Sequence, residues 1–357
     1  MPAFTGQLRS NEIFSVLYNF ILSQQVFADN ISGTNAQLVD KAKIDVGLAG
    51  DQKLFYATDV LKSAPWGKDA EASNLLALHR PPAPSCQAII IDTFRQISLT
   101  VDQYLSKRAW GTIDAFSEFT TVMLGWIGET KRVYDSTTYN AYFGTAETSV
   151  GKQARSIALS GITQTGEEKN RIEAQMIAED IANLLVEMGD VSRDFNDYGY
   201  LRSYDPSKIM VVWNSKYLNK IKKVDVPTIF NKDGLIDKLD SEVLPARYFG
   251  TVNTASGTTA SSNTTIRSLI EKDYGNKHLF PGDLLPNSTA YAAKETYTEN
   301  ANVICKVVVK LPAYMSAFEV GTSFFNAKSL TENHYLTFGH NSLEYFKAYP
   351  LITVKAA

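Results

Sequence analysis

Two long segments of the chain carry apolar residues at the spacing of an α-helix. Between Thr112 and Tyr142, apolar side chains recur every three or four positions, which predicts a helix of about 30 residues and about 45 Å. The same spacing returns between Glu167 and Met188, with acidic residues at the start and Gly189 at the expected end. Acidic residues complement the positive end of the helix dipole, and glycine commonly terminates a helix. We therefore expect two long helices.

A dense apolar cluster follows the second of these helices, within the stretch SKIMVVWNSKYLNKI from Ser207 to Ile221. Ile209–Trp213 reads as a buried strand, and the polar break after it is followed by a short helical segment. We expect Asn214 to cap that segment, because asparagine is favoured at helix starts. Burial of Ile209, Val211 and Trp213 should stabilise the fold by roughly 1.5–3 kcal/mol each. The segment predicts a helix–strand–helix unit.

Strand-like patterns occupy much of the remaining chain. Apolar residues between Cys86 and Tyr104 lean toward a period of two, which is typical of a strand. Further strands are expected at Val303–Leu311, at Tyr314–Phe325 and within Tyr335–Val354, with a turn near Asn341. Together with the helices, these strands indicate an α+β protein.

The N-terminal region contains an apolar run, Ile13–Leu22, followed by a small-residue pattern at Val26-Phe27-Ala28 that resembles a signal-peptidase site. Glu12 abuts the run and Asn19 interrupts it. We therefore favour an amphipathic helix over residues 11–28 that docks on its own protein or on a neighbour. Since no stretch reaches the roughly 20 apolar residues that span a bilayer, we expect no membrane partner.

Residues 54–100 combine apolar side chains with prolines that prevent a compact central sheet. Pro65, Pro81, Pro82 and Pro84 interrupt the segment. Large apolar groups on a projecting loop need a covering surface, and such patches usually mark an interface. We expect the loop to reach across a neighbouring subunit. The candidate contact residues are Leu54, Phe55, Tyr56, Trp66, Leu75 and Leu76.

The composition is that of an ordinary globular chain. It has 357 residues, 44% apolar and 20% charged, which suffices for one large or two ordinary domains. The net charge of −3 gives no reason to expect a nucleic-acid reader, although a local basic patch remains compatible with that sum. Cys86 and Cys305 lie in apolar strand-like runs, so we expect both thiols to be reduced and buried.

Each candidate motif for a catalytic, cofactor or metal site in the sequence is incomplete. The segment Gly144–Lys152 resembles a phosphate loop, but six residues separate its outer glycines where the motif has four. His334 and His340 lack the spacing of a metal pair. Three aspartates, Asp194, Asp197 and Asp205, are compatible with a cation site, and we favour a solvated loop instead. We expect no catalytic residues, no cofactor and no metal, which tilts the interpretation toward a structural protein rather than an enzyme.

The order of these elements resembles that of major capsid proteins of tailed bacteriophages, whose coat fold was first described for phage Hong Kong 97. The resemblance covers nearly the whole chain and rests on organisation: an arm, a long hairpin loop, a long spine helix, a helix followed by IMVVWNSKYLNKI, a variable loop and closing strands. In that family a helix precedes a buried strand that ends at an asparagine. Here these are Glu167–Met188, Ile209–Trp213 and Asn214.

The resemblance implies a tailed-phage coat fold with four parts. An N-terminal arm, an extended hairpin loop with flanking strands, a peripheral domain with the spine helix, and an axial domain with a central mixed sheet flanked by helices are expected. Their boundaries are 1–44 for the arm, 45–104 for the loop, 105–160 and 311–340 for the peripheral domain, and 161–310 and 341–357 for the axial domain.

The same resemblance implies a function. A member of this family assembles with copies of itself into hexamers and pentamers of an icosahedral shell, a virion capsid formed in the host cytoplasm. The shell encloses double-stranded DNA without sequence-specific binding, and portal and scaffolding or decoration proteins are expected partners. Any scaffolding function is expected to reside in a separate protein. Two alternatives stay open: a cellular nanocompartment shell of the same fold, and a soluble α/β enzyme with an unrecognised site.

Overall fold

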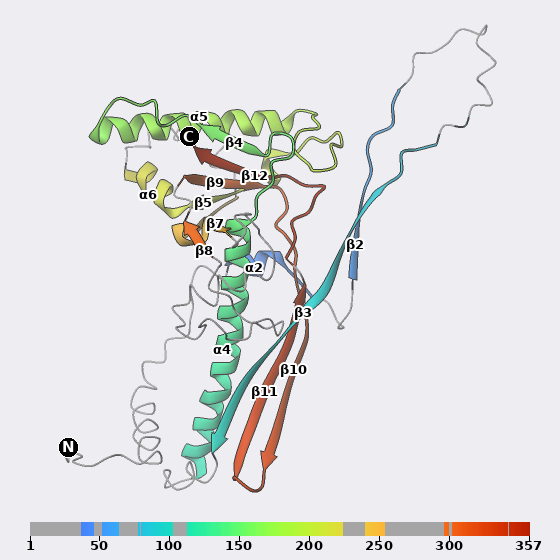
Figure 1. Cartoon of the computed structure of the whole chain (residues 1–357), viewed down its shortest axis with the longest axis vertical. Helices are drawn as coiled ribbons and strands as arrows, with labels where there is room; N and C mark the ends of the chain where they lie inside the picture. Colours follow the sequence, from blue (N-terminus) through green and yellow to red (C-terminus); the bar gives the residue numbers. More distant parts are fainter. Residues whose placement is uncertain are drawn as a thin grey trace. The chain divides into compact units, whose positions relative to one another are not determined.

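The computed structural model describes residues 37–45, 52–63, 78, 80–102, 113–223, 240–253, 296–299, 302–341 and 343–357. The chain divides into two compact units (Figure 1). Unit 1 comprises Met1–Asp51, Ile91–Tyr139 and Tyr314–Ser342, and unit 2 comprises Gln52–Ile90, Asn140–Ala313 and Leu343–Ala357. The amphipathic helix expected over residues 11–28 lies outside the described residues.

A five-stranded mixed sheet forms the centre of unit 2. Its order is β4-β12-β9-β5-β6. The strands are β4 (Ala154–Ile157), β12 (Leu351–Ala356), β9 (Val303–Val308), β5 (Met210–Asn214) and β6 (Asp240–Leu244). The outer pairs β4–β12 and β5–β6 are parallel, whereas β9 runs antiparallel to both of its neighbours. The sheet therefore joins segments from distant parts of the sequence.

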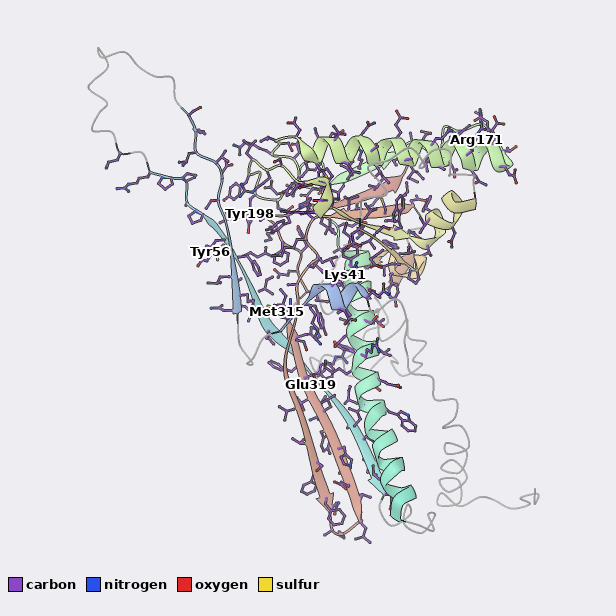
Figure 2. The ribbon with its side chains drawn as sticks, turned by 180° about the vertical axis from the view of Figure 1, so that it is seen from behind. Lys41, Tyr56, Arg171, Tyr198, Met315 and Glu319 are labelled. Carbon is purple, nitrogen blue, oxygen red and sulfur yellow. The ribbon has the colours of Figure 1, made fainter. Side chains whose placement is uncertain are left out.

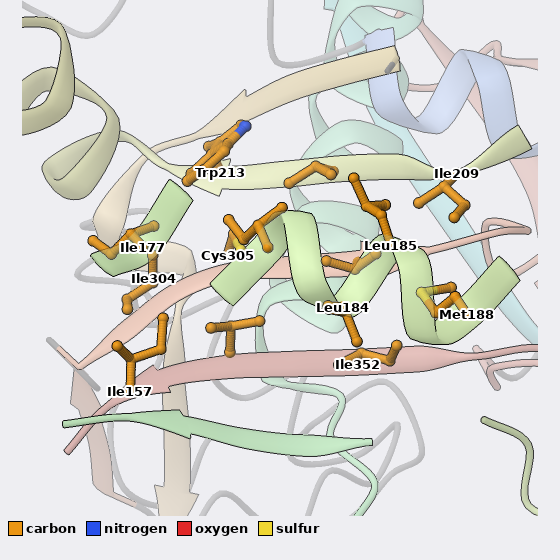
Figure 3. Close-up of a cluster of buried hydrophobic side chains, with 14 of the residues drawn as sticks. Ile157, Ile177, Leu184, Leu185, Met188, Ile209, Trp213, Ile304, Cys305 and Ile352 are labelled. Carbon is orange, nitrogen blue, oxygen red and sulfur yellow. The ribbon is translucent and has the colours of Figure 1, made fainter. Parts of the chain in front are cut away.

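The helix α5 (Gly166–Gly189) packs against this sheet and closes the main core (Figure 3). Leu184, Leu185 and Met188 are fully buried, and they share one cluster with Ile209 and Trp213. The predicted helix Glu167–Met188 and the predicted burial of the strand after it are thus confirmed. Period-3.6 spacing had placed these side chains on one helical face.

The expected cap at Asn214 is also confirmed. This residue ends β5, and the helix α6 (Ser215–Lys223) begins directly after it. The Asn214 side chain is fully buried and accepts a hydrogen bond from Lys216 N at 3.0 Å through Oδ1. Its Nδ2 donates to Val303 O at 2.8 Å, across to β9. The polar break in the sequence therefore starts a helix and ties it to the sheet.

Smaller elements complete the described part of unit 2. The 3-10 turns are η4 (Pro206–Lys208) and η6 (Ala246–Tyr248). The strands β7 (Gly250–Asn253) and β8 (Thr296–Glu299) pair antiparallel, as do β2 (Gln52–Ala57) and the first part of β3 (Ser85–Asp102).

Unit 1 is built around the strand order β1-β10-β11-β3. These are β1 (Lys43–Asp45), β10 (Tyr314–Asn326), β11 (Thr331–Asn341) and the part of β3 from Ile91 onward, preceded by the short helix α2 (Gln37–Ala42). The predicted strands at Cys86–Tyr104 and Tyr314–Phe325 correspond to β3 and β10. The predicted region Tyr335–Val354 contains the end of β11 and the start of β12, separated by non-strand residues.

The long helix predicted between Thr112 and Tyr142 is confirmed as α4 (Ile113–Thr145), which contributes residues to both units. Gly125 and Gly128 lie inside it, and a Cβ at either position would meet nothing within 4 Å. Gly144 differs, because a Cβ there would lie 2.0 Å from Tyr248 O. This glycine therefore permits a close backbone approach at the end of the helix.

Candidate assembly surface

The strongest candidate site is one face of the two-stranded ribbon made by β2 and residues 85–90 of β3. The antiparallel register pairs Gln52 with Ile90, Leu54 with Ala88, and Tyr56 with Cys86. Directly paired residues project on the same side of a sheet. Every second residue is exposed in both strands. The register thus assembles an outward face, here called the ribbon face: Gln52, Leu54, Tyr56, Cys86, Ala88 and Ile90.

The ribbon face is mostly apolar and open to solvent in the single chain. Leu54 is 45% exposed, Tyr56 is 66% exposed and Ile90 is 44% exposed. Figure 2 shows Tyr56 at the ribbon. Val60 and Leu61, which follow β2, are exposed as well. A contiguous exposed apolar strip of this kind usually marks a surface that another molecule covers.

The opposite face of the ribbon is held by the body of unit 2. The Phe55 ring meets the Phe346 ring edge-on at a centroid distance of 4.6 Å. Gln87 is buried; its Nε2 donates to Tyr345 O at 2.9 Å, and its Oε1 accepts from Lys347 N at 3.0 Å. These contacts fix which side of the ribbon is covered within the chain and which side remains available.

The predicted contact residues thus separate into three groups. Leu54 and Tyr56 lie on the ribbon face. Phe55 lies on the covered face against Phe346. Trp66, Leu75 and Leu76 lie outside the described residues. Ile90 and Ala88 join the ribbon face although the sequence alone gave them no such role, because only the β2–β3 register shows which residues stand beside Leu54.

The prediction that both cysteines are buried is wrong for Cys86. Cys305 is buried in β9, where burial raises the pKa of its thiol, whereas Cys86 is exposed on the ribbon face. Both thiols are free. The run after Cys86 is apolar apart from Gln87, but its alternate residues lie on opposite faces of a ribbon, and only one of these faces is covered.

A cavity of about 550 Å³ lies at the base of the ribbon. Its lining includes Phe55, Tyr56, Tyr198 and Arg202. Beside it, the Lys310 ammonium lies 4.7–5.4 Å from the ring centres of three aromatic residues: Phe55, Phe346 and Tyr349. Partial desolvation lowers the pKa of Lys310. The cation and the three rings stiffen the junction where the ribbon leaves the body.

Asp197 acts as a structural clamp that joins three segments of unit 2, a role that its sequence context does not reveal. Its Oδ1 accepts hydrogen bonds from Thr148 Oγ1 at 3.2 Å and from Gln153 Nε2 at 2.8 Å. Its Oδ2 accepts from Tyr345 OH at 2.5 Å. Burial, and next the bond to Asp197, raise the pKa of Tyr345 to about 12. The expectation of a solvated aspartate loop is therefore wrong for this residue.

The other two aspartates and the histidines have separate local roles. Asp194 pairs with Lys152 at 3.1 Å, and Asp205 accepts from Ser207 N at 2.9 Å. His340 is buried in unit 1, with Nε2 2.9 Å from Tyr134 OH. Among the residues that the structure describes, no three His, Cys, Asp or Glu side chains gather as a metal site. No helix in that same part of the chain is long and apolar enough to cross a membrane.

Lys306 is a second residue whose structural role the sequence did not reveal. It is fully buried in β9, and its Nζ donates to Phe143 O at 2.9 Å and to Ala146 O at 2.5 Å. Phe143 lies in the last turn of α4 and Ala146 directly follows the helix, where backbone acceptors lack helical partners and the helix dipole favours a cation. Desolvation lowers the pKa of Lys306 to about 7. The side chain ties the helix end to the central sheet.

Comparison with solved structures identifies the fold of this chain. No protein-family model and no curated protein matches the sequence. The capsid structure of Staphylococcus phage Andhra contains a chain that is 13% identical, with a TM-score of 0.59 over 92% of this chain and 84% of that one. The structure of the head fiber and inner core protein gp22 of native bacteriophage P68 contains a chain that is 11% identical, with a TM-score of 0.58 over 88% of this chain and 83% of that one.

A third likeness extends over the full chain. The asymmetric unit of the bacteriophage PhiM1 mature capsid contains a chain that is 8% identical, with a TM-score of 0.50 over 100% of this chain and 92% of that one. At such identities the likeness establishes the fold and not the activity. This chain therefore has a phage-capsid fold, which confirms the α+β coat fold expected from its sequence.

Proposed function

We propose that this chain is a major capsid protein that assembles with copies of itself into a closed icosahedral shell. The observation that carries the proposal is the ribbon face, an apolar strip around Leu54, Tyr56 and Ile90 that the single chain leaves open. The phage-capsid fold supports it. In this proposal unit 1 corresponds to the peripheral domain and unit 2 to the axial domain.

The ribbon face requires a partner for a physical reason. A two-stranded ribbon is marginally stable in water, and here only one of its faces is packed. Covering Leu54, Tyr56 and Ile90 removes apolar area from water, which stabilises by roughly 25 cal/mol for each Å² buried. A second copy is the occupant that we favour, because a repeating shell supplies the same cover to every subunit. Hexamers and pentamers provide that repetition.

Further parts of the proposal follow from the shell. It encloses double-stranded DNA without sequence-specific binding, works with portal and scaffolding or decoration proteins, and belongs to the virion after assembly in the host cytoplasm. The subunit acts structurally, without a catalytic site. The net charge of −3 suits this role, since a strongly basic inner wall would hinder DNA entry.

The test replaces the apolar side chains of the ribbon face while keeping its strands. In the variant Leu54→Thr, Tyr56→Thr, Ile90→Thr, threonine retains strand preference but removes most of the apolar area. We expect a folded subunit by circular dichroism and no closed particles by sedimentation. The matched control is Val186→Gln, which changes a 69% exposed apolar residue on α5 and should assemble as the parent does.

Closed particles formed by the triple variant at parental yield would contradict the proposed contact. Loss of particles in the Val186→Gln control as well would show that assembly responds to any surface change, and would contradict it equally. The same particles distinguish the two alternative functions. A nanocompartment shell would contain one enzyme, whereas a soluble enzyme would form no shell.

A further inference from the structure

The ribbon of β2 and β3 is bonded at one end to a single loop of unit 2, residues 192–202, here called the anchor loop. One end of the ladder between the two strands lies at Ser85. Directly beyond this end, on the chain that leaves β2, Thr58 O accepts a hydrogen bond from Arg202 Nη2. On the β3 side, the hydroxyl oxygens of Ser85 and Tyr200 lie 2.5 Å apart. The anchor loop therefore holds both strands where their pairing ends.

Asp59 is the central acceptor between the ribbon and the anchor loop. Its Oδ2 accepts a hydrogen bond from Arg193 Nη1 at 2.7 Å, and its Oδ1 accepts one from Leu201 N at 3.0 Å. Oδ1 also accepts from Val60 N at 2.9 Å. The bond from Leu201 N, and next the bond from Arg193, lower the pKa of Asp59 to about 2. The carboxylate is therefore charged at neutral pH, and charge-assisted hydrogen bonds are stronger than neutral ones.

The anchor loop is itself braced by internal hydrogen bonds. Ser192 and Arg202 exchange two backbone hydrogen bonds, both of 2.9 Å, which close the loop. Inside it, the buried Asn196 side chain donates to Tyr200 O at 2.7 Å and accepts from Tyr200 N at 2.8 Å. Gly199 turns the chain with a φ of +64°, a left-handed conformation that glycine adopts without steric cost. The loop is therefore a fixed support against which the ribbon is held.

The position of the Asp59–Arg193 pair separates it from the stability of the core. The Asp59 side chain is 18% exposed and the Arg193 side chain is 48% exposed. Ion pairs this open to water contribute little to the free energy of unfolding, because water screens them. Val60 and Leu61, which follow Asp59, are exposed apolar residues. The pair therefore acts on the path of the chain beyond β2, where apolar side chains are presented to a neighbour.

We propose that Asp59 is a positioning residue for assembly. Held by Arg193 and Leu201 N, it fixes the direction in which the chain beyond β2 leaves unit 2, so that Val60 and Leu61 meet the neighbouring copy in one orientation. Asp59 acts through this segment and does not contact the neighbour itself. A segment that is ordered before it binds loses less conformational entropy on association. The proposal rests on the proposed function, because it requires a neighbouring copy of the chain.

The experiment makes three measurements on the full chain carrying Asp59→Ala. They are the urea midpoint of unfolding, the amide hydrogen exchange of residues 58–63 in unassembled subunits, and the yield of closed particles by sedimentation. The matched control is Asp194→Ala, in the same loop. It removes a carboxylate that pairs with Lys152 at 3.1 Å. The two variants therefore lose the same kind of group from one loop, and only Asp59→Ala loses the bonds to the ribbon.

We expect Asp59→Ala to speed exchange in residues 58–63 about tenfold, because losing a charged hydrogen-bond acceptor shifts a local opening equilibrium by about that factor. The yield of closed particles should also fall about tenfold, because the segment must then be ordered during association. The urea midpoint should stay at that of Asp194→Ala. Asp194→Ala should match the parent in exchange and in particle yield.

Parental exchange or parental particle yield in Asp59→Ala would overturn the positioning role, as would an equal loss of particles in Asp194→Ala. A urea midpoint lowered by Asp59→Ala and not by Asp194→Ala would also overturn it, because Asp59 would then support the fold. Failure of the proposed function has a different signature. A parent chain that forms no particles would refute the shell and the positioning role together, whereas a parent and an Asp59→Ala variant that assemble equally would refute only the positioning role.

Discussion

The buried amino group of Lys306 makes the stability of unit 2 depend on pH in a direction opposite to that of a salt-bridged lysine. Burial disfavours the charged form, so the pKa falls from its ordinary value of 10.5 to about 7. Glu147 partly offsets this fall, and Lys355 adds to it. These two neighbours form an ion pair with each other at 2.8 Å.

The sign follows from proton counting. Between pH 7 and pH 10.5 the unfolded chain binds one proton that folded Lys306 does not. Stability therefore rises with pH in this window, by about 1.4 kcal/mol per pH unit. The full difference of about 3.5 pH units corresponds to about 5 kcal/mol as an upper limit. Below pH 7 both states hold the proton, and the folded protein bears the whole cost of the buried charge.

The assay is urea unfolding of the unassembled chain at several pH values, with Lys306→Met as the variant. Cys305 and buried tyrosines such as Tyr142 have raised pKa values, so the unfolded chain loses their protons first above about pH 9 and stability falls there. The useful window is therefore about pH 7 to about pH 8.5. Within it the parent should gain about 2 kcal/mol relative to Lys306→Met.

The pH dependence is the readout, because the absolute stability of Lys306→Met mixes two opposite effects. Methionine removes a buried charge but leaves Phe143 O and Ala146 O without their donor. Lys208→Met, a change at an exposed lysine, is the control and should follow the parent curve. Parallel curves for the parent and Lys306→Met across the window would refute the buried-charge reasoning.

Three further predictions concern stability and thiol access. Asn214→Ala should lower the free energy of unfolding by about 3 kcal/mol, since it removes a helix cap and a buried hydrogen bond; full rescue by Asn214→Asp, which restores only the cap acceptor, would contradict this. Gly144→Ala should lower the free energy of unfolding by about 3 kcal/mol, because the added Cβ clashes with the backbone of Tyr248. Gly128→Ala, in the same helix, is the control and should be neutral or stabilising in the same urea assay. Equal effects of the two changes would disprove the close backbone approach at Gly144. A thiol reagent should label Cys86 rapidly in unassembled subunits, slowly in shells, and Cys305 only after denaturation; rapid labelling of both in native subunits would rule out the burial pattern.

Elements governed by local sequence could be predicted. The helices α4 and α5 follow from apolar spacing, and the cap at Asn214 follows from the preference of a short polar side chain for a helix start. These features depend on residues a few positions apart. The apolar period and the helix cap therefore predicted the helix–strand–helix unit, with boundaries that differ from the observed ones by one or two residues.

Features that depend on distant pairing could not be predicted. Lys306 appears in the sequence as one charge inside an apolar strand, and its acceptors at Phe143 and Ala146 lie about 160 residues earlier. Cys86 alternates with covered residues, but only the register with β2 shows which side of the ribbon is open. The Asp197 clamp likewise joins loops remote in sequence.

The most direct test of the capsid proposal is electron microscopy of the full chain after expression without other proteins, with scaffolding protein added in a second sample. The account predicts closed icosahedral shells of hexamers and pentamers in at least one sample, and their loss in the Leu54→Thr, Tyr56→Thr, Ile90→Thr variant. Small oligomers alone in both samples, with folded subunits by circular dichroism, would contradict it.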